Sequence, residues 1–152
     1  MHWHCLPFAE LGVQRLYGAL ALRSEVFVVE QHCVFLDIDG LDPHTWHLLG
    51  EGDDGRLLAY ARLIPPGLEG ADALIGRVVT SPAARGSGTG RALMAEALAQ
   101  CRRLWPAQGI TLHAQAHLER FYASFGFLPV GEPYIEDGIP HIEMRLPQGD
   151  KT

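Results

Sequence analysis

The sequence is almost without lysine. Lys151 is its one lysine, so arginine supplies the other basic residues among a Lys and Arg total of 12, and the formal net charge is −6. A chain of this charge has no basic stripe for a phosphate backbone, which argues against a nucleic-acid partner. The negative balance instead favours a cationic substrate such as an amine.

Cysteines and long apolar runs are also scarce. The three cysteines Cys5, Cys33 and Cys101 include no Cys-x-x-Cys pair, which argues against a disulfide framework or structural zinc. His113 and His117 are spaced i, i+4, but position 114 is not a glutamate, so we expect no metal site. No apolar run approaches the roughly 20 residues of a membrane span, and we see no signal peptide or repeat. We therefore expect one cytoplasmic domain over residues 1–152 with no membrane partner.

Glycine, by contrast, is concentrated at one place. The stretch Gly76–Met94 reads GRVVTSPAARGSGTGRALM, which indicates a β-branched strand, a Ser-Pro stop and a Gly-rich turn that opens a helix. Glycines let backbone N–H groups crowd an anion at a helix N-terminus, where the helix dipole favours negative charge. We expect the amides of residues 86–91 to cradle a phosphate group.

The kind of phosphate site follows from the residues around the turn. A Walker loop needs a lysine before Ser or Thr, and Lys151 lies far from the turn. A dinucleotide fingerprint needs a third glycine where the chain has Leu93, and an acidic residue about 20 residues later. The pattern that remains is Arg-x-x-Gly-x-Gly, formed by Arg85, Gly88 and Gly90.

This pattern resembles the pyrophosphate loop of the Gcn5-related N-acetyltransferases (the GNAT superfamily), which bind acetyl-coenzyme A (acetyl-CoA). A second motif, FYASFGF over residues 121–127, resembles the Phe-Tyr-x-x-x-Gly-Phe segment of the same family at the family's spacing. The resemblance implies an acetyl-CoA-dependent N-acetyltransferase that transfers the acetyl group directly to an unidentified small-molecule or peptide amine. Most of the length is similar to the ElaA-like branch, in the stretches LRSEVFVVEQ (22–31), DIDGLD (37–42), AQAHLERFYASFGF (114–127) and EDGIPHIEM (136–144).

The resemblance also implies roles for individual residues. The strand before the turn is expected to bulge and to splay from the next strand, so that Val78, Val79 and Thr80 face the pantetheine arm and the thioester. Tyr122 matches the family's tyrosine acid, which protonates the departing thiolate. Gln115 replaces an asparagine that often contacts the pantetheine amides. The turn completes the implied cofactor site with Arg85, Gly86, Ser87, Gly88, Thr89, Gly90 and Arg91.

The general base and the acceptor site are less well defined. The amine must lose a proton before it attacks, and the candidate bases are Glu30, His117, Glu136 and His141. For each of them, the alternative is a solvated surface charge or a hydrogen-bonded core histidine. The candidate acceptor rim consists of Glu30, Glu136, Asp137 and His141.

An acidic loop between residues 31 and 45 admits two interpretations. Its aspartates Asp37, Asp39 and Asp42 either cap turns and pair with arginines, or attract a primary amine together with the acceptor rim. The arginines available for pairing are Arg23, Arg62 and Arg77. The sequence leaves both interpretations open.

The periodicity of apolar residues predicts an α/β fold, in which helices flank a mixed central β-sheet, as in the GNAT acyl-CoA N-acyltransferase fold. We expect helices over 10–28 and 89–105 and around Tyr122, and a hairpin turn over 52–55. The expected strands cover residues 3–8, 46–51, 56–64, 73–80, 110–114, 128–130 and 139–146.

Two other functions compete with an N-acetyltransferase. Acyl-homoserine-lactone synthases share the fold and resemble this chain at Arg23, Val26, Phe27, Arg62 and the acidic loop. Against them, 152 residues are short for a carrier-protein docking surface and a deep acyl pocket. The third hypothesis is a non-catalytic module that binds acyl-CoA. The sequence also leaves a homodimer open.

Overall fold

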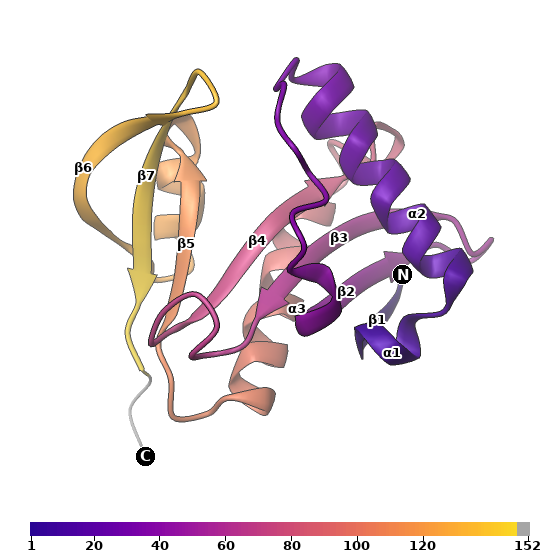
Figure 1. Ribbon diagram of the computed structural model, residues 1–152, viewed down its shortest axis with the longest axis horizontal. Coiled ribbons are helices and arrows are strands. Elements are labelled where there is room, and N and C mark those ends of the chain that lie inside the picture. Colours follow the sequence, from indigo (N-terminus) through magenta and orange to yellow (C-terminus); the bar gives the residue numbers. More distant parts are fainter. Residues whose placement is uncertain (149–152) are drawn as a thin grey trace.

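A mixed sheet of seven strands runs through the molecule, whose computed structural model describes residues 1–148 (Figure 1). The strand order is β1-β2-β3-β4-β5-β7-β6. β4 and β5 pair in parallel, whereas the other neighbours are antiparallel. The strands are β1 (His2–Pro7), β2 (Trp46–Glu51), β3 (Leu57–Ile64), β4 (Ala73–Thr80), β5 (Ile110–Gln115), β6 (Leu128–Glu136) and β7 (Ile139–Leu146).

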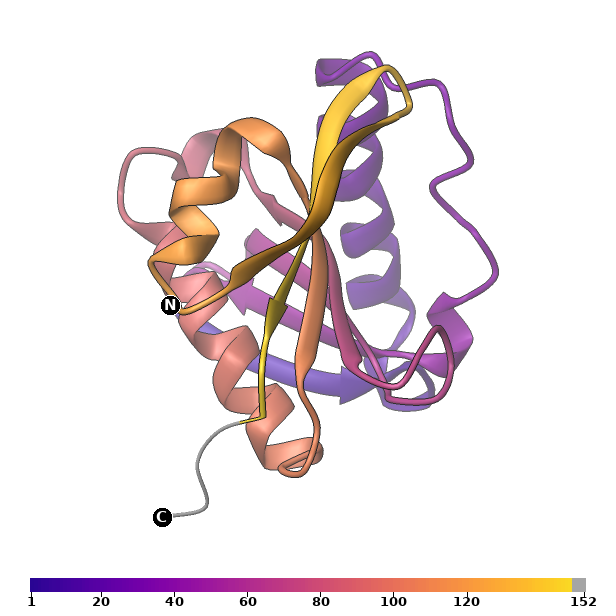
Figure 2. The same ribbon diagram turned by 90° about the vertical axis from the view of Figure 1, so that its left-hand side faces the viewer.

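Helices cover both faces of this sheet (Figure 2). One face carries α1 (Phe8–Leu11), α2 (Val13–Arg23) and the π-helix η1 (Ser24–Glu30), which continues α2. The opposite face carries α3 (Thr89–Leu104) and α4 (Glu119–Ala123). Short 3₁₀ turns lie at η2 (Asp42–His44), η3 (Pro82–Ala84) and η4 (Ala116–Leu118).

The central strands contribute side chains to two hydrophobic cores, one on each face of the sheet. In β2, Leu48 packs in the core under α3 and Leu49 in the core under α2, and both are fully buried. In β3, Ala59 likewise packs in the core under α3 and Tyr60 in the core under α2. Successive side chains of a strand point to opposite faces, so strands covered on both sides become continuous apolar runs. This arrangement accounts for the unbroken apolar sequence of β3.

The expected α/β architecture with a mixed sheet is confirmed. β2, β4 and β7 have the predicted bounds, and α3 ends one residue before the predicted end. The predicted hairpin turn is present, since Gly52 N–H donates to the Arg56 carbonyl at 2.9 Å. None of the helices within residues 1–148 has the length and apolar character needed to cross a membrane.

Two predicted elements were wrong by more than one residue, whereas β1, β3 and β5 differ from the prediction by no more than one residue at either end. The single helix over 10–28 is divided, because Gly12 with a φ of 81° separates α1 from α2, and the last turns adopt π geometry. The last hairpin was also underestimated, since β6 extends to Glu136 rather than ending at Val130. Gly131 and Pro133 interrupt its apolar pattern, and its pairing with β7 is irregular between Val130 and Tyr134.

Candidate active site

A cleft opens where β4 and β5 diverge. These two strands pair at Ala73 with Ile110 and at Leu74 with Thr111, at their beginnings. Beyond these pairs they separate (Figure 1), and a cleft of about 950 Å³ lies between them. Its walls come from β3, β4, β5, η1 and the loop that follows it, η4, α4 and the β6–β7 hairpin. The predicted splay of β4 from the next strand is therefore confirmed.

β4 also carries the predicted bulge. Tyr60 of β3 pairs with Val79, whereas Arg62 pairs with Gly76, so β4 has one extra residue between these pairs. Arg77 lies in this bulge with a φ of 50°, in the left-handed region. A bulge interrupts the regular ladder and redirects the residues next to it. The residues that follow Arg77 line the cleft, namely Val78, Val79 and Thr80.

The Gly-rich turn has the backbone geometry of an anion cradle. Gly86 and Gly88 have φ values of 82° and 80°, which residues with side chains rarely adopt. The hydrogen bond from the Ala92 N–H to the Gly88 carbonyl, at 3.1 Å, begins the α3 ladder. The N–H groups of residues 89–91 precede that bond and point out of the helix end. A Cβ built on Gly90 would meet no atom within 4 Å, so a ligand can approach the backbone there.

Side chains of the turn hold it in place and connect it to α4. The Ser87 hydroxyl lies 2.9 Å from the Thr89 hydroxyl and donates to the carbonyl three residues before it at 2.6 Å. The Arg91 guanidinium lies 5.0 Å from the centre of the Phe125 ring and donates to the Ser124 hydroxyl at 3.2 Å. Arg91 thus links the Arg-x-x-Gly-x-Gly turn to the FYASFGF segment, two motifs that are distant in the sequence.

Tyr122 lies in the wall of the cleft at the end of α4. Its side chain is buried against Phe121 and Phe127, whose rings meet the Tyr122 ring edge-on at 5.1 and 6.3 Å. Within residues 1–148 the Tyr122 hydroxyl makes no hydrogen bond, and it lines the cleft. Burial raises the pKa of Tyr122 to about 12, so the phenol is protonated at neutral pH.

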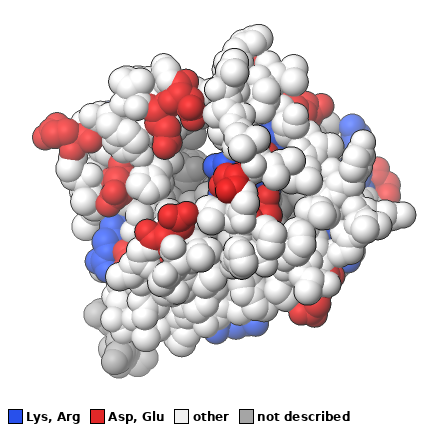
Figure 3. All heavy atoms as spheres, in the orientation of Figure 1, with Lys and Arg blue, Asp and Glu red and all other residues white. Residues whose placement is uncertain are grey.

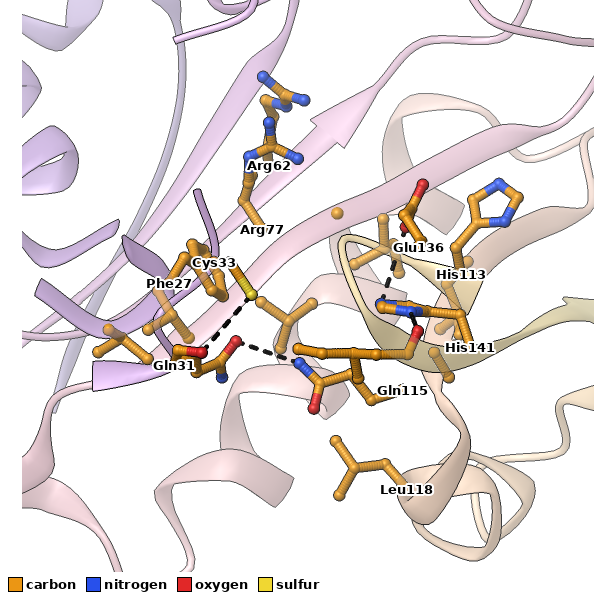
Figure 4. A pocket seen from close by; sticks show the side chains of 18 of the residues that line it. Phe27, Gln31, Cys33, Arg62, Arg77, His113, Gln115, Leu118, Glu136 and His141 are labelled. Atoms are coloured by element: carbon orange, nitrogen blue, oxygen red, sulfur yellow. Dashed lines mark hydrogen bonds and ion pairs between the residues drawn. The ribbon is translucent and has the colours of Figure 1, made fainter. Parts of the chain in front are cut away.

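His141 has one ring nitrogen fixed and the other available. Its Nδ1 donates to the carbonyl of Ile139 at 2.8 Å, which leaves Nε2 unprotonated in the neutral ring. Nε2 lies 3.7 Å from the carboxylate of Glu136 (Figure 4), and the ring stacks on Tyr134 at 6.0 Å. His141 and Glu136 both line the cleft, as does Asp137 in the hairpin turn between β6 and β7. This geometry is typical of a histidine that can accept a proton at Nε2.

The other candidate bases also lie in the cleft wall, in different surroundings. His117 is part of η4, at the end of β5. Glu30 ends η1, and its carboxylate forms an ion pair of 2.7 Å with Arg85, at the start of the Gly-rich turn. The Glu30 carboxylate is thus engaged by an arginine, whereas no hydrogen bond within residues 1–148 engages the Nε2 of His141.

Gln115 ends β5 and lines the cleft. Its side-chain amide donates to the side-chain oxygen of Gln31 at 3.2 Å (Figure 4). The Cys33 thiol contacts the backbone carbonyl of Gln31 at 3.8 Å. Gln115 is therefore already engaged across the cleft, by a residue from the opposite wall.

The acidic loop is bound to the protein by arginines, in an Arg–Asp network of Arg23, Arg62, Arg77, Asp37, Asp39 and Asp42. The fully buried Arg23 donates to Asp37 at 3.0 Å and to Asp42 at 2.8 Å. Arg62 donates through both terminal nitrogens to the two carboxylate oxygens of Asp39, each at 2.8 Å. The predicted pairing of these aspartates with arginines is confirmed, and none of the three aspartates lines the cleft.

A GNAT acetyltransferase domain model matches residues 44–147, and whole-chain relatives extend the match. The chain is 48% identical over 146 residues to protein ElaA of Escherichia coli, with 95% of each chain covered. It is 46% identical over 149 residues to a UPF0039 protein of Synechocystis, with 97% of each covered. The chain belongs to the GNAT acetyltransferase family.

Solved structures of GNAT proteins have the same fold. An acyl-CoA N-acyltransferase from Pseudomonas aeruginosa is 49% identical with a TM-score of 0.91, over 95% of this chain and 97% of that one. The Escherichia coli ElaA structure is 47% identical with a TM-score of 0.89, over the same shares. An acyl-homoserine lactone synthase, BjaI, matches at 19% identity with a TM-score of 0.76, over 95% of this chain and 82% of that one, which shows a shared fold alone. As a GNAT acyltransferase, the protein uses an acyl-CoA cosubstrate.

The cleft brings together most of the residues that the sequence singled out for this GNAT chemistry. The turn residues after Arg85 are the exception, since they lie beyond the cleft lining. Within residues 1–148, no group of three His, Cys, Asp or Glu side chains could hold a metal ion. The lining includes Glu30, Val78, Val79, Thr80, Arg85, Gln115, His117, Tyr122, Glu136, Asp137 and His141.

Sequence reasoning missed several residues of the cleft. Gln31 was not proposed, although it meets Gln115 across the cleft. The contact of His113, which lines the cleft, with Tyr134, which stacks on His141 outside the lining, was also missed: the His113 Nδ1 lies 2.8 Å from the Tyr134 hydroxyl. No local signal marks these contacts, because each partner comes from a distant segment of the chain.

Proposed function

We propose that this protein transfers an acetyl group from acetyl-CoA to a primary amine by direct attack of the amine on the thioester. The observation that carries the proposal is the cleft between β4 and β5, which gathers candidate groups for every step from separate elements. These are the bulged β4 strand, Arg85 before the Gly-rich turn, Tyr122 of α4 and His141 of β7. The acetyl group is the acyl group named by the matching family model, an acetyltransferase domain.

The cofactor site is assigned from the fit between the Gly-rich turn and a pyrophosphate. Two glycines with positive φ precede a 16-residue helix whose leading N–H groups are free to donate. Arg85 adds a cationic side chain at the start of the turn, and at Val78, Val79 and Thr80 the edge of β4 lines the cleft without pairing to β5. The N–H of Val79 is our candidate for polarising the thioester carbonyl.

Acid and base functions are assigned to two groups in the cleft. Acetyl-CoA supplies an activated thioester, whose C–S bond breaks as the C–N bond forms. Tyr122 gives its proton to the departing sulfur, because its raised pKa keeps it protonated and no other group of residues 1–148 engages its hydroxyl. The Nε2 of His141 takes one proton from the ammonium group before attack, since the Nδ1–H is held by Ile139, and the second proton that the nitrogen loses as the amide forms restores Tyr122. Glu136 then stabilises the resulting imidazolium.

The acceptor class is inferred from the carboxylates of the β6–β7 hairpin. Glu136 and Asp137 line the cleft, and the nearest basic partner of Glu136 is His141 rather than an arginine. In Figure 3 the mouth of the cleft is a hollow with acidic atoms around its rim. Unneutralised carboxylates attract cations, so we assign a positively charged primary amine as the acceptor.

The test is a thiol-release assay with acetyl-CoA and a panel of amines, namely spermidine, tyramine, lysine and a peptide with a free N-terminus. We expect CoA release that depends on at least one of these amines, together with the acetylated amine by mass spectrometry. If CoA binds in calorimetry and no amine is acetylated, the protein is a non-catalytic acyl-CoA-binding module and the proposal fails.

A further inference from the structure

Two neighbouring residues at the end of η1 reach across the cleft. The Glu30 carboxylate lies 2.7 Å from the Arg85 guanidinium, and the Gln31 side-chain oxygen accepts a hydrogen bond of 3.2 Å from Gln115 (Figure 4). Arg85 begins the Gly-rich turn, and Gln115 ends β5. One end of the π-helix is therefore tied to the start of the Gly-rich turn, which the proposed function assigns to the cofactor, and to Gln115, which the family resemblance assigns to the pantetheine amides.

The π-helix presents these side chains to the cleft. Its wide turn is visible in the hydrogen bond from the Gln31 N–H to the carbonyl five residues earlier, at 2.9 Å. Phe27, Glu30 and Gln31 line the cleft, whereas Glu25 and Val29 are exposed on the other side of the same segment. Single π turns within helices occur frequently at functional sites.

We propose that Glu30 and Gln31 are positioning residues, whose contacts with Arg85 and Gln115 form a clasp across the cleft. Acyl-CoA opens this clasp by competing for Arg85 and Gln115. The proposal rests on the proposed function, because it requires the pyrophosphate to bind the Gly-rich turn. A pyrophosphate on this turn competes with Glu30 for Arg85, and the pantetheine amides compete with Gln31 for Gln115.

The relative strengths of these contacts favour the cofactor. Glu30 and Arg85 are 42% and 43% exposed, and a solvent-exposed ion pair changes an equilibrium by only about 1.4- to 5-fold. A hydrogen bond to a charged group such as phosphate contributes about 10- to 150-fold. The clasp therefore weakens cofactor binding slightly without preventing it.

Opening of the clasp has a consequence for the acceptor rim. When Arg85 turns to the pyrophosphate, Glu30 loses its counterion and becomes a free carboxylate in the cleft wall, like Glu136 and Asp137. An additional free carboxylate attracts a cationic amine more strongly. Cofactor binding thus prepares the acceptor site, and the amine binds after acetyl-CoA.

The first experiment measures CoA affinity by calorimetry in the wild type, Glu30→Gln and Glu25→Gln. We expect Glu30→Gln to bind CoA about 2- to 5-fold more tightly, because Arg85 no longer has a competing partner. Glu25→Gln removes the same charge from the same segment without touching Arg85, so its CoA affinity should equal that of the wild type. Equal tightening in both variants would attribute the effect to net charge and overturn the clasp.

A second experiment tests the Glu30–Arg85 contact itself. In an Arg85→Gln protein, the additional change Glu30→Gln should no longer tighten CoA binding, because the two residues act through each other. Gln31→Ala should also tighten CoA binding, by about 2-fold or more, since it frees Gln115. Weaker binding in either single variant would show that the bridge supports the cofactor site rather than competing for it, and would overturn the clasp.

Steady-state kinetics test whether opening of the clasp strengthens amine binding. The amine used is the one from the panel that gives the highest turnover. Glu30→Gln should raise the KM of that amine about 3-fold or more while CoA affinity improves, a split that a structural defect would not produce. An unchanged amine KM overturns the coupling. Failure of CoA to bind the wild type would instead refute the proposed function, so the two failures are distinguishable.

Discussion

The Arg–Asp network and the acceptor rim contain the same kinds of residue in opposite circumstances. In the network every carboxylate has an arginine partner, at 2.8 to 3.0 Å, and Arg23 and Arg62 are almost completely buried. In the acceptor rim, Glu136 has His141 at 3.7 Å, Asp137 has no ion pair within residues 1–148, and Glu30 has an arginine partner, Arg85 at 2.7 Å, but both side chains are solvent-exposed. The three aspartates of the network lie outside the cleft, although Arg62 and Arg77 line it, whereas every member of the rim lines the cleft.

This contrast separates structural charge from binding charge. A buried carboxylate that is neutralised by arginine fixes the position of a loop and has little charge left for a ligand. A carboxylate without a cationic partner keeps its field and can bind a cation. The aspartates and glutamates that looked alike in the sequence should therefore respond differently to substitution.

The largest effect is expected from breaking the network. Arg23→Ala removes the fully buried guanidinium and leaves Asp42 with Arg62 alone and Asp37 with Arg77 alone, which should lower the free energy of unfolding by about 3–5 kcal/mol. In a domain of this size the melting temperature should fall by about 10 °C or more. Thermal and denaturant unfolding of the purified variant measure both quantities.

Arg15→Ala is the matched control for this change. Arg15 lies on the same helix, α2, and its guanidinium pairs with Glu51 at 3.1 Å while 37% exposed. Exposed pairs contribute about 0.2–1 kcal/mol, so this variant should melt close to the wild type. Equal destabilisation by the two variants would show that burial of the network has no special role.

The second effect concerns chemistry rather than folding. Tyr122→Phe should lower kcat by roughly 100-fold, because it removes the proposed proton donor to the thiolate. The hydroxyl makes no hydrogen bond within residues 1–148, so CoA affinity and melting temperature should change little. Tyr17→Phe, at a tyrosine that is 79% exposed, is the control. A Tyr122→Phe enzyme with wild-type kcat would reduce Tyr122 to a packing role.

Much of the fold could be predicted because its signals are local. The β-branched run of β4 and the apolar periodicity of α3 identified both elements nearly to the residue. The break at Gly12 was missed because one glycine within a helical pattern is compatible with several conformations, and only packing of α1 decides between them. The π geometry of η1 likewise has no sequence signature.

The site divides in the same way between local and long-range signals. The Gly-rich turn and the position of Tyr122 in the cleft were predictable from motifs. The bridge between Gln31 and Gln115 was not, because the partners are separated by 84 positions in the sequence. The tautomer of His141 depends on a backbone carbonyl in a hairpin turn, which no residue pattern specifies.

The third prediction tests the acceptor rim, which the comparison sets against the Arg–Asp network. Glu136→Gln and Asp137→Asn should each raise the KM of the amine about 3- to 10-fold and leave CoA affinity unchanged, since they remove free carboxylates from the rim. Asparagine suits position 137, where φ is 51°. Added salt should raise the wild-type KM, because charges are screened over about 10 Å at 0.1 M. If the KM of the amine is unchanged by both substitutions and by added salt, a cationic acceptor is excluded.

The smallest effect is a dependence of stability on pH that belongs to the network. Burial alone would raise the pKa of Asp39, but hydrogen bonds from Arg62 and the Leu41 N–H, with the charges of Arg62 and Arg77, lower it to about 2. The pKa of Asp42 is also lowered, against its burial, by Arg23 and Arg62.

Because these folded-state pKa values lie below the unfolded value of about 3.9, both carboxylates stabilise the fold above pH ~4 and lose that contribution as the pH falls towards 2. Denaturant unfolding between pH 5 and pH 2.5 should therefore show a steeper loss of stability in the wild type than in Asp39→Asn. Asp53→Asn is the control, since Asp53 is 95% exposed and should leave the slope unchanged. The effect of Asp39 is modest because its carboxylate is partly open to solvent, which screens the ion pair. If Asp39→Asn and the wild type lose stability in parallel, the network does not hold its carboxylates in the charged form, and its contrast with the acceptor rim would rest on packing alone.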